Sequence, residues 1–373
     1  MIYLDNAATT MPSKTAVDRA QTFNEKDFFN PSALYSGGLS CARAIRQAKD
    51  SILKNLGTIY HDVIFNSCGS ESDNTAIFCA VKRGVFITSQ GEHSAVYKSF
   101  LELKNRNFPV EFLPLTQDGS IDIDAYTSYI KNNKVDFISI VHVNNETGAI
   151  NDINHLAKIA KTIDNKIIFH SDGVQAYGKI PYKLSKDVDL YSISAHKINA
   201  LKGVGALIKK KGLNLSPLIF GGGQENGFRS GTENVFGIKV FEFASEEKYS
   251  NIKENYELVK EIKNYFINNL DSKIFTLISG ENSSPYILTV SAKGLRGEVV
   301  MHALEQQGII VGNGSACSSK NRFSRVIEAC GYKNDVLDGV IRISFSTENS
   351  LEQAKIAVEV INSTVKRLKG ILE

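Results

Sequence analysis

The chain has 373 residues, with 43 Lys and Arg against 40 Asp and Glu, so its formal charge is +3. This near balance argues against an electrostatic nucleic-acid binder, and an apolar fraction of 42% excludes a disordered chain. Five cysteines are too few for a disulfide framework, and their odd number suits a reducing cytoplasm, where we expect the protein. We expect neither a signal peptide nor a membrane span, because no apolar run approaches the ~20 residues that a span needs.

Up to about residue 250, short β-branched runs alternate with longer helical patterns. This alternation predicts an α/β fold in which helices cover both faces of a mainly parallel sheet. The expected strands are 62–66, 85–88, 135–143, 166–170, 189–194 and 204–209, and the expected helices include 39–56, 70–82, 93–104 and 152–163.

After about residue 250 the pattern changes to that of a smaller α+β domain, which a helix at 251–270 would link to the first. We expect two strands packed against one face of helices. The strand-like stretches are 286–290, 309–311 and 340–344, and the helical ones are 297–307, a short one near 324–329, and 351–368.

Lys197 and Asp172 each stand just after a predicted strand. Ligands of open α/β sheets bind at strand ends, where burial lowers the pKa of a lysine and makes its amine nucleophilic. A lysine that forms a Schiff base and an acid that pairs with a ring nitrogen together suit pyridoxal phosphate (PLP). The alternatives are a solvated lysine in a turn and an aspartate in a turn or helix cap.

A possible phosphate site lies between the strand 62–66 and the next helix, at Gly69 and Ser70. Free amides at a helix start bind anions. Ser70 and Asp73 also have the spacing of a capping box, although any strand-to-helix turn can look the same.

Cys317 differs from the other cysteines because it lies in a segment of small residues flanked by glycines. Such a segment predicts a mobile loop that presents a reactive thiol. Cys41, Cys79 and Cys330 fit packing positions, and Cys68 is left open because it borders the possible phosphate turn.

Arg342 is a charge in the middle of the predicted strand 340–344. Its planar guanidinium suits a clamp for a substrate carboxylate. The alternative is an edge position that faces solvent.

With these segments placed, the chain resembles the cysteine desulfurases of the NifS/IscS type, PLP enzymes of the aminotransferase class V family. The resemblance covers essentially the whole chain, and its motifs occur in the family's order. The matching segments are Tyr3–Thr10, Asn30–Ser32, Gly69–Asn74, Glu92–His93, Asn144–Gly148, Asp172 with Gln175, Ser194–Lys197, Arg229–Thr232, Ser315–Ser319 and Arg342.

The resemblance implies the PLP-dependent fold type I, with a large, mainly parallel, seven-stranded-type sheet domain and a smaller α+β domain. Residues 15–250 would form the large PLP-binding domain. Residues 1–14 and 251–373 would form the small domain, which carries the catalytic cysteine loop and the arginine for the substrate carboxylate.

The resemblance also assigns roles around the cofactor. Lys197 would carry PLP and Cys317 would receive sulfur. Asp172 would pair with the ring nitrogen and Gln175 with the ring oxygen, while His93 would stack on the ring and assist proton transfers.

The remaining implied contacts concern the phosphate and the substrate. Asn145, which also borders the cofactor, and Arg342 would bind the substrate carboxylate. The phosphate would be held by the backbone of Gly69 and Ser70, the side chains of Ser194 and His196, and Thr232 of the other subunit in a homodimer with shared active sites.

The implied reaction removes sulfur from L-cysteine and releases L-alanine. Lys197 would move the α-proton, and Cys317 would attack the sulfur and keep it as a persulfide. A sulfur-acceptor protein would then take the persulfide for iron–sulfur cluster assembly or for tRNA or cofactor thiolation. The length of the segment from Cys317 to Arg342 suggests the group with a long loop. The basic stretch 320–325 would attract an acidic acceptor or simply be a solvated helix start.

The sequence departs from the family pattern in the phosphate turn and in the segment from Cys317 to Arg342, and two alternative functions stay open. The phosphate turn has Cys68-Gly69-Ser70, where the family more often has Gly, a small residue and Thr, yet Ser70 keeps the hydroxyl. A selenocysteine lyase or another class V enzyme would use the same fold, and a scaffold without catalysis is the second rival. We expect no metal site, because the sequence has no CxxC or HxxxH spacing.

Overall fold

The computed structural model describes residues 1–80, 83–313 and 323–372. The elements of its first part are β1 (Ile2–Leu4), α1 (Lys14–Ala20), α2 (Thr22–Glu25), α3 (Ser36–Asn55), β2 (His61–Asn66), α4 (Gly69–Cys79), β3 (Val85–Ser89), α5 (Ser94–Asn105), β4 (Val110–Leu113), α6 (Ile123–Asn132), β5 (Val135–Ser139), α7 (Ile153–Ile163), β6 (Ile168–Asp172), β7 (Leu190–Ser194), β8 (Gly205–Lys210) and α8 (Val235–Ser250).

The second part begins directly after α8. Its elements are α9 (Ile252–Asn269), β9 (Phe275–Leu277), β10 (Ile287–Ala292), α10 (Gly297–Glu305), β11 (Ile309–Val311), α11 (Arg325–Ala329), α12 (Asn334–Leu337), β12 (Val340–Ser344) and α13 (Leu351–Leu372). Two 3₁₀ turns, Ala195–Lys197 and Glu225–Gly227, lie within the first part.

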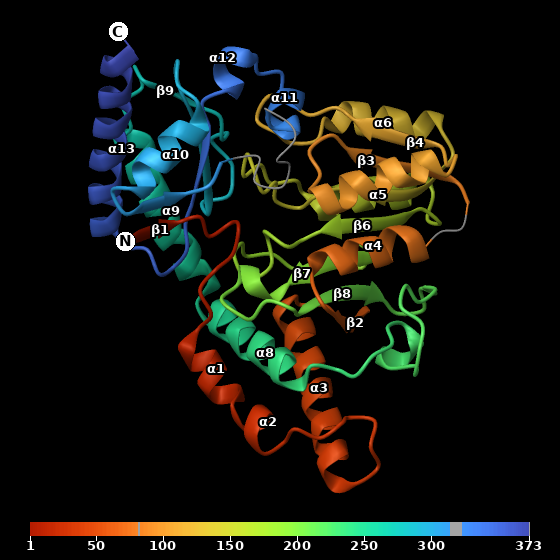
Figure 1. The fold of residues 1–373 in the computed structure, drawn as a ribbon. Helices are drawn as coiled ribbons and strands as arrows, with labels where there is room; N and C mark the ends of the chain where they lie inside the picture. Colours follow the sequence, from red (N-terminus) through yellow and green to blue (C-terminus); the bar gives the residue numbers. More distant parts are fainter. Residues whose placement is uncertain (81–82, 314–322, 373) are drawn as a thin grey trace.

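A seven-stranded sheet in the order β2-β8-β7-β6-β5-β3-β4 forms the centre of the first part (Figure 1). Only β8 runs antiparallel to its neighbours, so the predicted mainly parallel sheet is confirmed. The sequence pattern did not reveal β4, a partly exposed edge strand whose apolar signal is weak. It also extended β5 to residue 143, whereas the strand ends at Ser139 and the buried chain continues as a loop.

Side chains that alternate along the strands build two separate cores, because successive strand residues point to opposite faces. Phe86, Phe137 and Leu207 pack with α4 and α5 on one face. Ile138 and Ile208 pack with α3, α6, α7 and α8 on the other. Burial of both faces explains why the strands have continuous apolar runs.

The second part has its own core, which contains Leu4 of β1 together with residues from α9, α10 and α13. Instead of the two strands expected, it has an antiparallel sheet β12-β10-β9 and a parallel pair β1-β11. β9 and β1 have only three residues each, too few for a clear pattern. The division into residues 15–250 and residues 1–14 with 251–373 stays a proposal, for which the separate core of the second part is one argument.

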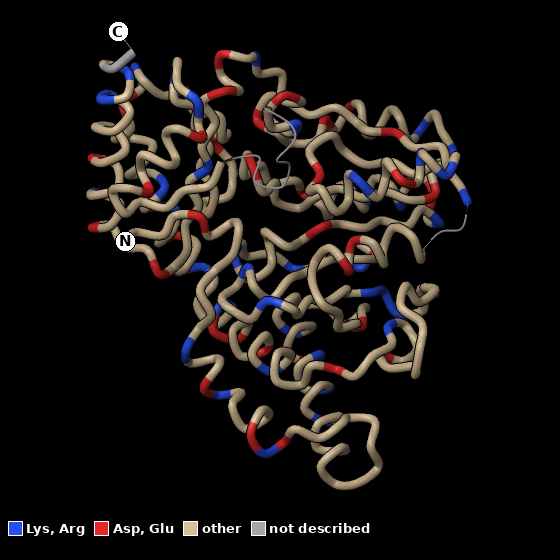
Figure 2. The backbone as a smooth tube through the Cα atoms, viewed as in Figure 1, with Lys and Arg blue, Asp and Glu red and all other residues tan. Residues whose placement is uncertain are grey.

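Basic and acidic residues are intermixed over both parts of the molecule (Figure 2). Within the described residues, no helix combines the length and the apolar character required to cross a membrane. The four described cysteines, Cys41, Cys68, Cys79 and Cys330, are all free thiols.

Candidate active site

One pocket, of about 520 Å³, lies where the carboxyl ends of β6 and β7 face the start of α4 and the strand β12. It brings together most of the residues predicted from the sequence. The predicted residues that line it are Gly69, Ser70, His93, Asn145, Asp172, Gln175, Ser194, His196, Lys197 and Arg342.

Lys197 ends the 3₁₀ turn that follows β7 and is partly buried in the pocket wall. Its Nζ donates to the carbonyl oxygens of Ala7 and Ala8, both at 2.7 Å. The N-terminal segment after β1 therefore holds the amine at the pocket, and the solvated-turn alternative is wrong for this lysine. Its neighbour His196 lies beside Thr9, and burial lowers the pKa of this imidazole to about 4.

The helix α4 begins at Gly69, after Cys68 as the N-cap residue, with no side-chain cap. A Cβ on Gly69 would lie 2.7 Å from Val174 Cγ2, so only glycine lets the helix start approach the end of β6. The buried hydroxyl of Ser194 faces the same region and has no hydrogen-bond partner among the described residues. First-turn amides and an unpartnered hydroxyl form a site for an anion.

The predicted capping box of Ser70 and Asp73 is wrong. Both residues lie inside α4, and Asp73 is only 1% exposed. The side chain that reaches back to the chain before the helix is instead that of Glu71, in the first turn of α4. Its carboxylate accepts from the backbone N–H of Ser67 at 2.9 Å. Arg229 donates to the other oxygen of Glu71 at 2.9 Å. The spacing took Ser70 as the N-cap residue, two positions after Cys68, which is the N-cap in the structure.

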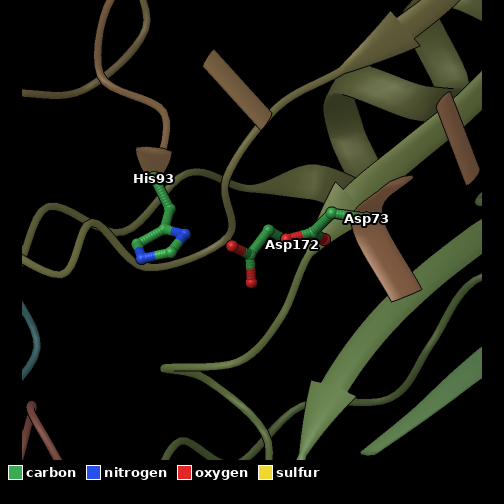
Figure 3. A group of neighbouring side chains, drawn as sticks. All are labelled: Asp73, His93 and Asp172. Atoms are coloured by element: carbon green, nitrogen blue, oxygen red, sulfur yellow. The ribbon is translucent and has the colours of Figure 1, made fainter. Parts of the chain in front are cut away.

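Asp73, His93 and Asp172 meet at the base of the pocket, with one polar atom of each within 4.8 Å of the others (Figure 3). Asp172 accepts from the backbone N–H of Val174 at 2.9 Å. Burial and the nearby Asp172 raise the pKa of Asp73 well above its usual range. Burial also raises the pKa of Asp172, although His93 and Lys197 oppose this change. Two buried carboxylates this close oppose each other's ionisation, and the nearby His93 and Lys197 favour the charged form of Asp172.

Such a cluster offers atoms that could also bind a metal ion, and sequence spacing did not reveal it. The charges around it oppose that use. The cations Lys197, Arg325 and Arg342 repel a proton on His93, and the same repulsion acts on a metal cation.

His93 is the N-cap residue of α5, and its Nδ1 accepts from the backbone N–H of Ala95 at 3.2 Å. Burial, which outweighs the attraction of Asp172, lowers the pKa of the imidazole. A neutral ring with its proton on Nε2 satisfies both observations, and Figure 3 shows this ring directed toward Asp172.

Arg342 is 4% exposed, so the alternative of a solvent-facing edge position is wrong. Its guanidinium donates to Asp5 Oδ1 and to the backbone oxygen of Asn145, both at 2.9 Å. A Cβ on Gly312 would lie 2.6 Å from Asp5 Oδ1, so this glycine makes room for the ion pair. The pair orients the guanidinium at the pocket wall.

Two predicted residues do not appear in the pocket. Thr232 is exposed on the loop before α8, and Cys317 lies outside the described residues. Burial raises the pKa of Cys79 to about 11 and of Cys330 to about 12, so both thiols stay protonated. Cys41 is fully buried, and Cys68 lines the pocket.

Two residues near the pocket, Asp5 and Arg325, were not predicted from the sequence. Asp5 was part of a matching segment but received no role. Arg325 lies over the Tyr97 ring at 3.7 Å and donates to the backbone oxygens of Gln90 and Glu92, the latter at 2.5 Å. The basic stretch 320–325, to which it belongs, predicts attraction of an acidic acceptor or a solvated helix start, and no local signal shows that an arginine will turn inward.

PLP fits this pocket on three structural grounds. The start of α4 and Ser194 offer donors for a phosphate, and Asp172 offers a buried negative charge for a protonated ring nitrogen. Lys197 supplies an amine within the same pocket.

Comparison with known proteins agrees with this geometry. The chain matches the family described as Aminotransferase class-V over residues 2–356. It is 36% identical to the cysteine desulfurase IscS of Dictyoglomus turgidum, over 99% of this chain and 96% of that protein. A solved NifS-like protein superposes with a TM-score of 0.91 at 29% identity, covering 98% of this chain and 99% of the other.

A second solved structure is described as SspA in complex with cysteine. It has a TM-score of 0.81 and 28% identity, and the match covers 93% of this chain and 99% of that one.

Proposed function

This chain belongs to the aminotransferase class-V family as a cysteine desulfurase, and from that premise we propose how its residues remove sulfur from L-cysteine. The fold is that of the NifS-like PLP enzymes. The observation that carries the proposal is that Lys197, Asp172 and Arg342, from three distant parts of the chain, line one pocket.

We propose PLP as the cofactor, which when bound supplies an aldehyde for amines and a ring that accepts electrons. Lys197 would hold the aldehyde, Asp172 the ring nitrogen and Gln175 the ring oxygen, and His93 would stack on the ring. The phosphate would be held by Gly69, Ser70, Ser194, His196 and Thr232 of the partner subunit.

In the reaction, Arg342 would bind the substrate carboxylate together with Asn145. Asp5 keeps the guanidinium oriented, so this contact costs little reorganisation. Lys197 Nζ would take the proton from the substrate α-carbon, and neutral His93 would exchange protons from Nε2.

Cys317 as a thiolate would attack the substrate sulfur. The carbon–sulfur bond breaks, sulfur stays on Cys317 as a persulfide, and the carbon skeleton leaves as L-alanine after protonation. The outer sulfur then passes to an acceptor protein for iron–sulfur cluster assembly or thiolation.

We further propose that the enzyme is a cytoplasmic homodimer. Large apolar side chains stay exposed in one chain, among them Phe28 at 70%, Leu34 at 90% and Phe220 at 79%. Phe220 lies on the loop that leads to Thr232. Exposed aromatic residues of this size favour coverage by a second copy.

The central test is incubation of the purified protein with L-cysteine. We expect equal amounts of alanine and transferred sulfur, with a mass increase of one sulfur atom on the peptide that contains Cys317. Cys317→Ser should still bind cysteine but transfer no sulfur. Sulfur transfer by this variant at the wild-type rate would rule out the proposed persulfide. The same assay with selenocysteine decides between desulfurase and selenocysteine lyase activity.

A further inference from the structure

Lys179 is a buried lysine that the proposed reaction does not use. It lies in the segment that follows β6 and Asp172, and it is 5% exposed. Among the described residues, no carboxylate pairs with its amine. Burial lowers the pKa of Lys179 well below its usual range, and repulsion from the cations Lys197, Lys248 and Arg342 adds to this change.

The amine of Lys179 donates a hydrogen bond to the side chain of Gln175. Its Nζ donates to Gln175 Oε1 at 2.7 Å and lies 5.9 Å from the centre of the Tyr286 ring. On the other side of the same amide, Gln175 Nε2 donates to the backbone oxygen of Ala7 at 2.9 Å. Ala7 O also accepts from Lys197 Nζ at 2.7 Å, so one network joins the two lysines.

This network determines which way the amide of Gln175 points. A carbonyl oxygen only accepts, so Ala7 O requires the N–H₂ side of the amide. Lys179 donates to the opposite side, so a flipped amide would lose both contacts. The remaining N–H of Gln175 is then the group available to the pocket, which Gln175 lines.

Burial of a lysine next to one neutral acceptor costs stability. Lys263 gives a comparison within the same chain, because it is 4% exposed but donates to Ser283 Oγ, Ser283 O and Ser284 O. Lys263 is therefore satisfied by the fold around it. Within the described part of the chain, Lys179 Nζ has one side-chain acceptor, Gln175 Oε1, and Gln175 in turn lines the pocket.

We propose that Lys179 is a positioning residue that holds the Gln175 amide with its N–H side toward the ring oxygen of PLP. The inference rests on the proposed function, because it requires PLP in the pocket. It adds a residue to the reaction that touches neither cofactor nor substrate. A flipped Gln175 would present its own oxygen to the ring oxygen, and two acceptors face to face repel.

The test compares Lys179→Met with the matched control Lys263→Met. We expect Lys179→Met to fold, to bind PLP about tenfold more weakly as the apoprotein, and to shift the pH midpoint of the visible absorbance upward by about one unit. Lys263→Met should lower the Tm but leave the midpoint of bound PLP in place. In a Gln175→Leu background, Lys179→Met should cause no further shift.

Three outcomes would overturn the inference. They are a wild-type midpoint in Lys179→Met, equal shifts in both lysine variants, or a Lys179→Met protein that fails to fold and thereby shows a structural role. Wild-type protein that takes up no PLP would instead contradict the proposed function.

Discussion

The pocket has two charged walls that are built in opposite ways. At the strand ends of the large sheet, Asp172 is a buried carboxylate whose pKa is raised and which lies near a second buried carboxylate, Asp73. On the strand β12 of the smaller sheet, Arg342 is equally buried but is paired with Asp5 and with the backbone of Asn145.

The difference shows what each wall is prepared for. A carboxylate left without an ion pair gains most when a cation arrives, as a protonated ring nitrogen would. A guanidinium that is already paired has a fixed orientation. Binding of a substrate carboxylate therefore requires little further ordering of this side chain. We call the side of the pocket around Asp172 the cofactor wall and the side around Arg342 the substrate wall. Among the described residues, the cofactor wall has a buried carboxylate without an ion pair, whereas the substrate wall has a guanidinium whose orientation is already set by Asp5.

Substitution of Lys197 should have the largest effect, because it removes the covalent attachment of PLP. We expect Lys197→Ala to hold no covalently bound PLP and to make alanine at least about 10³-fold more slowly, because attachment and proton transfer both fail. Borohydride reduction followed by mass analysis, together with alanine release, measures both. Borohydride-fixed PLP on the variant would contradict the assignment.

Substitution of Arg342 should weaken the use of cysteine as substrate without weakening the binding of PLP. Arg342→Met should lower kcat/KM for cysteine by about 30–100-fold while PLP affinity stays within about twofold. Asp5→Asn should lower it by only about 3–10-fold, since it loosens the guanidinium without removing it. Equal losses in PLP affinity and in kcat/KM would show that the two walls are not separate.

Glu92, a buried carboxyl group, should make the free energy of unfolding depend on pH. Burial raises its pKa from 4.5 to about 8, so between these values the native state binds more protons than the unfolded chain. Stability therefore falls as pH rises from about 4.5 to about 8. Glu92→Gln should remove this part of the fall, leaving the apoprotein about 2–4 kcal/mol more stable relative to wild type at pH 8 than at pH 5.

Denaturant unfolding of both apoproteins at pH 5 and pH 8 measures this difference. The expected sign is opposite to that of a carboxylate in a salt bridge. Parallel pH profiles would show that Glu92 is already ionised in the folded protein.

Cys68 should give the smallest effect, although it lines the pocket. Its side chain makes no cap hydrogen bond, and its contact with Ser67 Oγ is long, at 3.6 Å. We expect Cys68→Ala to keep PLP affinity and alanine release within about twofold, with the persulfide still on Cys317. Loss of the persulfide in this variant would make Cys68 a second sulfur carrier.

Much of the cofactor wall could be predicted because its signals are local. Lys197 and Asp172 stand directly after strands, and strand ends are visible as the point where an apolar run meets polar residues. The helix start at Gly69 was also located to within one residue. The error over the capping box came from the same local reading, since the spacing placed the N-cap at Ser70 whereas the structure has it at Cys68.

The sequence by itself determined the fold class, most strands of the large sheet and the polar residues at their ends, because these depend on neighbours within a few residues. Only the tertiary structure decided the pairings of Arg342 with Asp5, Asp172 with Asp73 and Lys179 with Gln175. In the first two the partners are far apart in sequence, and in the third the contact depends on how deeply a loop is buried. Burial raises the pKa of Asp73 and Asp172 and lowers that of Lys179, and burial is a property of the packed molecule.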